Sequence, residues 1–454
     1  MKNNFKLSII GALSLFLITS CEKNLDINPT QSIDETQALL TSSDVEAALV
    51  GAYSDLGDAD SYGGALFVRS ELLGNSPNEI NWSGTYQTMT QIFNKQIPVD
   101  NSDVSATWTD AYQTINDVNN VLDAIDIVLE TKKDRVEGEA KFIRGSLYFD
   151  LVKLYAKAWN DGDPTANDGV PLVLEPTRAP LGDKDQKARA KVSEVYAQVI
   201  ADLTSAEELL PDDNGFFASK YAAAAMLARV YLQKGDYTNA AAAASRVIES
   251  GVFGLTQTYA EAFPYDDLNS SSVIGNTTED VFAMQVTATQ GINDFNTYFS
   301  PIGRGDIDIN QDYLDQFEAG DDRLNMYYDD GSIRTGKFDM FYSAVHIIRL
   351  AEMYLTRAEA NFREGTEVGA APVDDINTIR ERVNLPDYDA ADLTLDLILT
   401  ERNHELAFEG QTLSDKKRTQ TDVGSIPWNS PKLIFPIPDR ERKVNPNLTQ
   451  NEGY

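Results

Sequence analysis

One stretch decides the fold of this chain: residues 219–250, which read SKYAAAAMLARVYLQKGDYTNAAAAASRVIES. Apolar residues recur at helical spacing through its first half, Gly235 interrupts the pattern, and a second alanine-rich run follows. Small alanines let two helix backbones approach closely, so the stretch predicts a helical hairpin. Such a hairpin cannot bury its remaining face alone and must stack on similar units. Its spacing is typical of a tetratricopeptide repeat of about 34 residues.

Other helix patterns along the chain supply neighbours for this hairpin. Apolar periodicity predicts further helices over 43–56, 108–129, 136–159, 192–210, 342–364, 373–383 and 393–410. The first of these opens with the capping-box residues Ser43 and Glu46. The pattern therefore predicts a mostly all-α protein of four stacked helix pairs with little strand.

Two long segments, 57–103 and 253–342, lack helical periodicity and are rich in glycine, asparagine, serine and aromatic residues. Loops of this length inside a compact protein are either disordered or functional, and their aromatic content argues against disorder. We expect them to be loop-rich insertions between the helices, with a short extended piece near 281–286. The proline-containing end, 433–454, shows no helical period and is expected to be ordered coil on the surface.

The charge of the chain excludes one class of partner. Acidic residues number 71 and basic residues 38, a formal net charge of −33. Nucleic acid is excluded as a partner because this surface would repel phosphate. The acidic residues are scattered among apolar ones, which indicates a solvated surface and not a disordered acidic tail.

The N-terminus carries a targeting signal. Lysines precede a short apolar run over residues 7–18, and Thr19, Ser20 and Cys21 follow. This is typical of a secretory signal peptide, residues 1–20. The stretch ending in Cys21 also resembles a bacterial lipobox, in which the cysteine is lipidated and becomes the first mature residue; an ordinary signal peptide with a chance cysteine is the alternative. The polar residues 21–41 would then form a tether, and 21–454 a single domain.

Signatures of catalysis and metal binding are weak. The two histidines, His346 and His404, form no zinc motif. An alternating acidic set imitates the start of a calcium loop but lacks its later glycine and glutamate; its members are Asp306, Asp308, Asn310 and Asp312. We therefore predict no catalytic residue, no metal site and no cofactor, with a loose calcium site as the less favoured alternative.

A charged face recurs at i, i+4 spacing within ERNHELAFEG, at Glu401, Glu405 and Glu409 with Arg402 between them. Its carboxylates could form a site. The interpretation that we favour is ion pairing on a helix surface and with neighbouring helices.

Aromatic and amide side chains in the two loop segments are the best candidates for ligand binding. An aromatic ring offers an apolar face to the C–H side of a sugar, and amide or guanidinium groups bond its hydroxyls. The alternative is that these rings anchor their own loops. The candidates are Trp82, Tyr86, Asn75 and Asn81 in the first segment and Tyr298, Phe299 and Arg304 in the second.

Several stretches along the mature chain carry a family resemblance. They are AKFIRGSLYFDLVKLYAKAW from Ala140, GVPLVLEPT from Gly169, LARVYLQKGDY from Leu227, ERNHELAFEG from Glu401 and FPIPDRERKVNPNLTQNEGY from Phe435. With them the chain resembles the SusD/RagB family of outer-membrane lipoproteins. The resemblance implies four tetratricopeptide-like pairs and a surface-exposed, lipid-anchored protein. It also implies a non-enzymatic protein that caps a TonB-dependent, SusC-like transporter and hands it oligosaccharide.

Three alternatives stay open at this point. The cargo could be peptide, as in some members of the family. The chain could be a surface glycoside hydrolase, although no pair of carboxylates stands out. It could also be a protein-interaction scaffold without a small ligand, in which case Trp82 and Tyr298 should be buried anchors.

Overall fold

The computed structural model describes residues 39–454 except 179–181, 183–184, 266–274 and 290. The expected signal peptide, Cys21 and the tether up to residue 38 lie outside the described residues. Along the described helices, none is both long enough and apolar enough to span a membrane.

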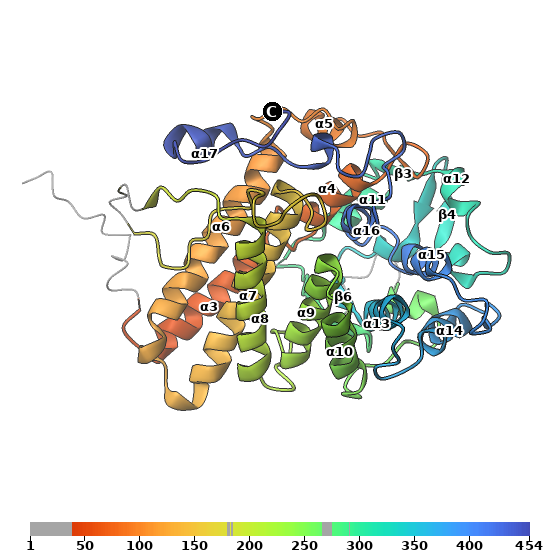
Figure 1. Ribbon diagram of the computed structural model, residues 1–454, viewed down its shortest axis with the longest axis horizontal. Coiled ribbons are helices and arrows are strands. Elements are labelled where there is room, and N and C mark those ends of the chain that lie inside the picture. The colour runs from red at the N-terminus through yellow and green to blue at the C-terminus, as the bar shows by residue number, and fades with distance from the viewer. Residues whose placement is uncertain (1–38, 179–181, 183–184, 266–274, 290) are drawn as a thin grey trace, which may run out of the picture.

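The body of the protein is a row of helices that follow one another across Figure 1 from left to right. Each packs on the next, which gives four successive pairs. They are α3 (Ser42–Leu56) with α6 (Ser102–Asp123), α7 (Glu130–Tyr155) with α8 (Val192–Leu209), α9 (Lys220–Lys234) with α10 (Tyr237–Ile248), and α13 (Leu350–Glu364) with α14 (Pro372–Arg382). The prediction of a mostly helical fold with four tetratricopeptide-like pairs is confirmed.

The hairpin α9–α10 forms for the reasons visible in its sequence. Ser219 caps α9 by accepting a hydrogen bond from the Ala222 amide. Gly235 ends the helix in the left-handed conformation at φ 73°, which glycine adopts without steric cost. The facing alanines, among them Ala225 and Ala244, are fully buried, so the two backbones approach closely.

Some helix boundaries differ from the sequence prediction. The cap of α3 is Thr41, which forms a capping box with Asp44 in place of the expected Ser43 and Glu46. The helix predicted from residue 342 starts only at Leu350, because the β-branched VHIIR before it is a strand, β6 (Val345–Arg349). The end of the chain is not all coil, since α17 (Asp439–Val444) interrupts it. Shorter helices α15 (Leu395–Glu405) and α16 (Thr412–Thr419) and the turn η7 (Pro431–Leu433) precede it.

The first loop segment contains a helix that periodicity could not reveal. Within 57–103 lie α4 (Ala65–Gly74), β1 (Ile80–Trp82) and α5 (Gln87–Phe93). Every residue of α4 is buried, including Arg69 and Glu71. A helix enclosed on all sides has no polar face, so ALFVRSELLG shows no amphipathic pattern.

The second segment pairs with the first through a small sheet at the right of Figure 1. Its strands run in the order β1–β3–β5–β4, and Ile80 and Trp82 of β1 pair antiparallel with Ile309 and Ile307 of β3. A second sheet pairs β2 (Asp280–Met284) with β6. The segment's other strands are β3 (Ile307–Ile309), β4 (Tyr327–Asp329) and β5 (Ile333–Thr335), and its short helices are α11 (Asp294–Phe299) and α12 (Gln311–Leu314). It also contains the 3₁₀ turns η4 (Tyr259–Ala262), η5 (Asp322–Met326) and η6 (Gly336–Phe338). Outside this segment, the turn η2 (Ile125–Ile127) links α6 to α7.

The charged face of ERNHELAFEG is buried, and this corrects the expectation of a helix surface. Glu401 and Glu405 on α15 are both inside the protein, and their partners are arginines brought from other elements. Arg323 contacts Glu401 at 2.6 Å, and Arg349 contacts Glu405 at 3.1 Å. The carboxylates point inward and are stabilised there by the buried guanidinium groups. These ion pairs join α15 to β6 through Arg349 and to α14 through Arg382.

Candidate functional site

The candidate site lies where the two loop segments meet, at the outer face of the sheet formed by β1 and β3. Side chains alternate across a strand, so Trp82 of β1 faces inward and its neighbour Asn81 faces outward. On β3 the isoleucines Ile307 and Ile309 face inward and Asp308 lies on the outer side. The strand register thus sets which predicted residues meet solvent.

Trp82 and Tyr298 are buried and hold the two segments together. Each is 8% exposed, and their ring centroids lie 5.9 Å apart. The indole nitrogen of Trp82 donates to the Thr90 hydroxyl at 2.9 Å. Burial raises the pKa of the Tyr298 hydroxyl well above its usual range. Both rings therefore act as anchors, as the scaffold alternative expected of them.

Tyr86 and Arg304 form an exposed pair at the edge of this face. The Tyr86 ring is 47% exposed, and the Arg304 guanidinium lies 4.2 Å from its centroid. Asp306 orients the guanidinium through a 2.6 Å ion pair and helps to raise the Arg304 pKa; Thr85 accepts a longer hydrogen bond from it. A ring and a fixed fork of donors are thus presented together at the surface.

A shallow groove of about 410 Å³ runs along the same sheet. Asn81 is exposed at its wall, and Arg334 holds Asp308 in an ion pair of 2.8 Å. The lining is otherwise made of Ile309, Asn310, Gln311, Ser332 and Ile333. Amide and hydroxyl groups of this kind donate and accept hydrogen bonds, which suits a polyhydroxylated ligand.

Two other predicted residues lie in the interior. Asn75 is 2% exposed and donates to the Glu71 carboxylate at 2.7 Å. Phe299 is 1% exposed and packs against Phe338 and Phe408. Neither reaches the sheet face, so neither belongs to the site that we propose below.

The residues that imitate a calcium loop are used elsewhere. Asp306 and Asp308 are engaged by arginines on either side of β3, and Asn310 donates to the carbonyl of Pro77. Residues two apart lie along the same face of an extended strand, so these side chains do not surround a common point as the ligands of a calcium-binding turn do.

A different carboxylate group does converge within the described residues. Ligand atoms of Asp58, Asp60 and Asp110 lie within 4.8 Å of one another. Burial and the adjacent carboxylates raise the pKa of Asp110 to about 6, while Arg69 pairs with Asp60 and offsets part of the charge.

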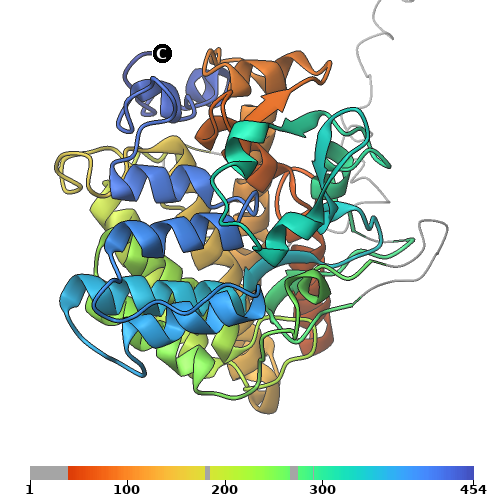
Figure 2. The same ribbon diagram turned by 90° about the vertical axis from the view of Figure 1, so that its right-hand side faces the viewer.

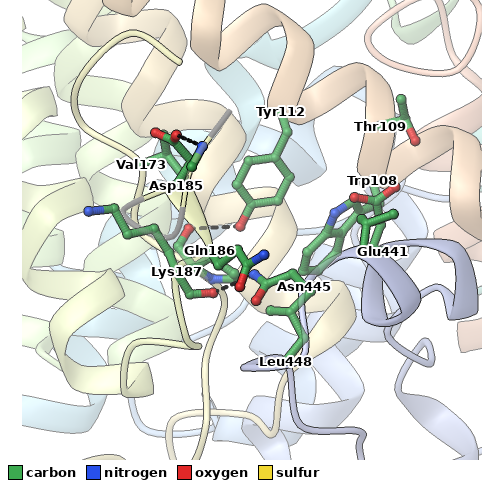
Figure 3. A pocket seen from close by; sticks show the side chains of 13 residues that line it. Trp108, Thr109, Tyr112, Val173, Asp185, Gln186, Lys187, Glu441, Asn445 and Leu448 are labelled. Atoms are coloured by element: carbon green, nitrogen blue, oxygen red, sulfur yellow. Dashed lines mark hydrogen bonds between the residues drawn. The ribbon is translucent and has the colours of Figure 1, made fainter. Parts of the chain in front are cut away.

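A cavity that is more enclosed than the groove along the sheet escaped sequence reasoning. It has a volume of about 400 Å³ and lies between α6, the described residues around Pro171 and Gln186, and the C-terminal region around α17 (Figure 3). Trp108 and Tyr112, four residues apart on α6, line one side, and Glu441 and Asn445 line another. In the sequence, the two rings fit the apolar face of a helix, and nothing indicated that a segment so distant in the chain would enclose them.

Comparison with known proteins agrees with this fold. Residues 23–232 match the family described as "Starch-binding associating with outer membrane", and residues 342–427 match the SusD family. The chain is 29% identical to SusD-like protein P2 of Formosa agariphila over 54% of this chain and 46% of that protein. It is 24% identical to the starch-binding protein SusD of Bacteroides thetaiotaomicron over the whole chain and 99% of that protein.

A solved structure from Bacteroides vulgatus, titled as a putative sugar binding protein, superposes with a TM-score of 0.80. The identity is 27%, covering 92% of this chain and 99% of that one. The match to P2 spans about half the length of that relative. Taken together, the two family matches, the full-length relative and the shared architecture define a helical-repeat protein of the outer-membrane-associated class. The chain belongs to the SusD/RagB family.

Proposed function

We propose that this protein is a cell-surface glycan-binding lipoprotein that captures oligosaccharide at the outer face of the β1–β3 sheet. One observation carries the proposal: Tyr86 is exposed beside a guanidinium that Asp306 fixes in place. The ring gives a sugar an apolar surface, and Arg304 with Asn81 gives its hydroxyls directed partners. Trp82 and Tyr298 contribute by holding this face rigid, which lowers the entropy cost of binding.

Two further parts of the proposal follow from family membership. The mature chain is anchored to the outer membrane through lipidated Cys21, and it works as the lid of a TonB-dependent, SusC-like transporter that receives the oligosaccharide. The protein binds without cleaving, which agrees with the ion pairs that engage Asp306 beside Arg304 and Asp308 in the groove.

The experiment is calorimetry of the purified protein against a fixed panel of neutral oligosaccharides and short peptides. The panel contains fragments of α-glucan, β-glucan, mannan, galactan and xylan. We expect one saccharide class to bind, and Tyr86→Ala to weaken it by about tenfold, as expected for the loss of one stacking ring. Phe216→Ala is the matched control, because Phe216 is an exposed ring (61%) on the distant α8–α9 connection.

The outcomes separate the alternatives. Binding of panel peptides alone would assign the chain to peptide capture. Turnover of a saccharide by the purified protein would identify a hydrolase. Equal affinity of the Tyr86→Ala variant and the native chain would remove the sheet face from the proposal.

A further inference from the structure

The cavity beside α17 contains polar groups that the fold leaves without partners. Trp108 is 3% exposed, yet its indole N–H has no hydrogen-bond partner among the described residues, and Figure 3 shows the nitrogen on the side of the ring toward Tyr112 and the cavity. Because the cavity opens onto this nitrogen, the N–H is available to a ligand acceptor. The side chains of Gln186 and Glu441 also line the cavity and, within the part of the chain that the structure describes, make no hydrogen bond or ion pair.

The walls of this cavity are fixed by hydrogen bonds from the helix body. Tyr112 donates its hydroxyl to the Pro171 carbonyl at 2.7 Å, and Tyr148 donates to the Val173 carbonyl at 2.8 Å. On the opposite side Asn445 and Asn447 donate to the carbonyls of residues 187 and 186, both at 2.8 Å. Tyr112 and Asn445 themselves line the cavity, and Tyr148 and Asn447 hold its walls from outside the lining, so the space is preformed.

The lining matches one class of ligand. Two aromatic rings and the side chains of Val444 and Leu448 give an apolar surface, while the unpartnered groups include a donor in Trp108 and an acceptor in Glu441. Each sugar hydroxyl can both donate and accept, and the C–H face of the ring covers apolar area. A peptide would add a strand to an open backbone edge, but the carbonyls of Pro171 and Val173 in this wall are already bonded.

We infer that this cavity is a second saccharide-binding site, formed by α6 and the C-terminal segment and separate from the β1–β3 face. A neighbouring hollow of about 250 Å³ shares Val173, Asp185 and Lys187 with it and continues along residues 172–177. Together the two hollows give room for a short chain of sugar units. The two proposed sites have no lining residue in common.

The experiment follows the indole N–H signals of the ¹⁵N-tryptophan-labelled full-length protein during titration with the same saccharide and peptide panel. The chain has four tryptophans, and loss of one signal in Trp108→Phe assigns Trp108. We expect at least one saccharide to shift the Trp108 signal saturably. The shift should persist in the double variant Tyr86→Ala/Arg304→Ala, which removes the first site.

Two cavity variants make the result specific. Thr109 is an exposed lining residue of α6, so Thr109→Trp should fill the cavity without disturbing the core, and the shift should vanish. Glu441→Gln should weaken the saccharide by about tenfold, the difference between a charged and a neutral acceptor.

Four results would overturn the inference: no panel saccharide shifts Trp108, only peptides do, the shift survives Thr109→Trp, or it disappears with Tyr86 and Arg304. The last result would mean a single site. Conversely, saccharide could shift the Trp108 signal while Tyr86→Ala leaves the saccharide affinity unchanged. That result would support the cavity site and reject the sheet face, so the two proposals can fail separately.

Discussion

Replacing Glu405 by glutamine should destabilise the protein strongly, because this carboxylate lies at the centre of the buried ion pairs. Glu405 is fully buried, and Arg382 and Arg349 both contact its Oε1, the second at 3.1 Å. Arg323 lies 3.7 Å from Oε2. Glutamine preserves the shape of the side chain and removes its charge, so the substitution isolates the electrostatic contribution.

The magnitude follows from the pKa of the carboxyl group. Burial alone would raise the pKa of Glu405, but the guanidinium groups of Arg382, Arg349 and Arg323 lower it to about 2. Because a free glutamate has a pKa of about 4.3, the ionised form stabilises the fold by about 3 kcal/mol relative to the neutral form. This agrees with the cost of about 3–5 kcal/mol for removing one partner from a buried ion pair.

Urea unfolding followed by circular dichroism measures the effect. At pH 7 we expect Glu405→Gln to lower the free energy of unfolding by about 3 kcal/mol with an unchanged m-value. Glu364→Gln, the same substitution at the exposed end of α13, should change it by less than about 0.5 kcal/mol.

The pH dependence supplies a second check with a defined sign. The folded pKa lies below the unfolded one, so the contribution of Glu405 is complete above about pH 4.3 and is lost as pH falls toward about 2. The gap between the native chain and Glu405→Gln should close over that interval. A gap under 1 kcal/mol at pH 7, or one that stays constant at low pH, would refute the reasoning.

Three further perturbations test the packing. Burial and nearby Arg323 lower the pKa of His404 to about 3. The neutral imidazole therefore contributes its full stability above about pH 6.5, and this contribution is lost as pH falls toward 3. In the native chain the unfolding free energy should fall by about 2 kcal/mol between pH 6.5 and 5, and His404→Phe should remove this fall. Gly74→Ala would place a Cβ 2.5 Å from the backbone nitrogen of Leu413 and should cost about 2 kcal/mol in urea unfolding; an unchanged midpoint would show that α4 can move away from α16. Trp82→Ala should lower the unfolding free energy by about 3–5 kcal/mol, and stability equal to the native chain would contradict its role as an anchor.

The helical body was predictable because its signals are local. Alanine spacing and the glycine stop at Gly235 fix the α9–α10 hairpin within a few turns of chain. The helix α4 was not predictable, because its polar residues Arg69 and Glu71 are buried among apolar ones and erase the contrast on which periodicity depends. Likewise β6 looks like the start of α13 until its partner β2, far away in the chain, is known.

The candidate site also combines features that local sequence signals predict with features that depend on pairing between distant segments. Composition singled out Trp82, Tyr86 and Arg304, but it could not say which would be exposed, since this depends on the register between β1 and β3. Pairing Trp82 with Ile307 turns the indole inward. Tyr86 lies beyond the end of the strand, at the first turn of α5, and stays at the surface.

The buried rings therefore anchor the loop segments, while the exposed ring is free to contact a ligand, so both interpretations of the aromatic residues hold for different members of the set. Anchoring and ligand contact were alternatives for the aromatic set as a whole, yet the anchors are what make the contact possible. Trp82 and Tyr298 join, together with the β1–β3 pairing, two segments that are far apart in the chain, and that junction places Arg304 over Tyr86. A ligand that contacts the exposed pair thus depends on the buried pair for its geometry, so anchor variants should lose saccharide affinity only to the extent that they lose stability.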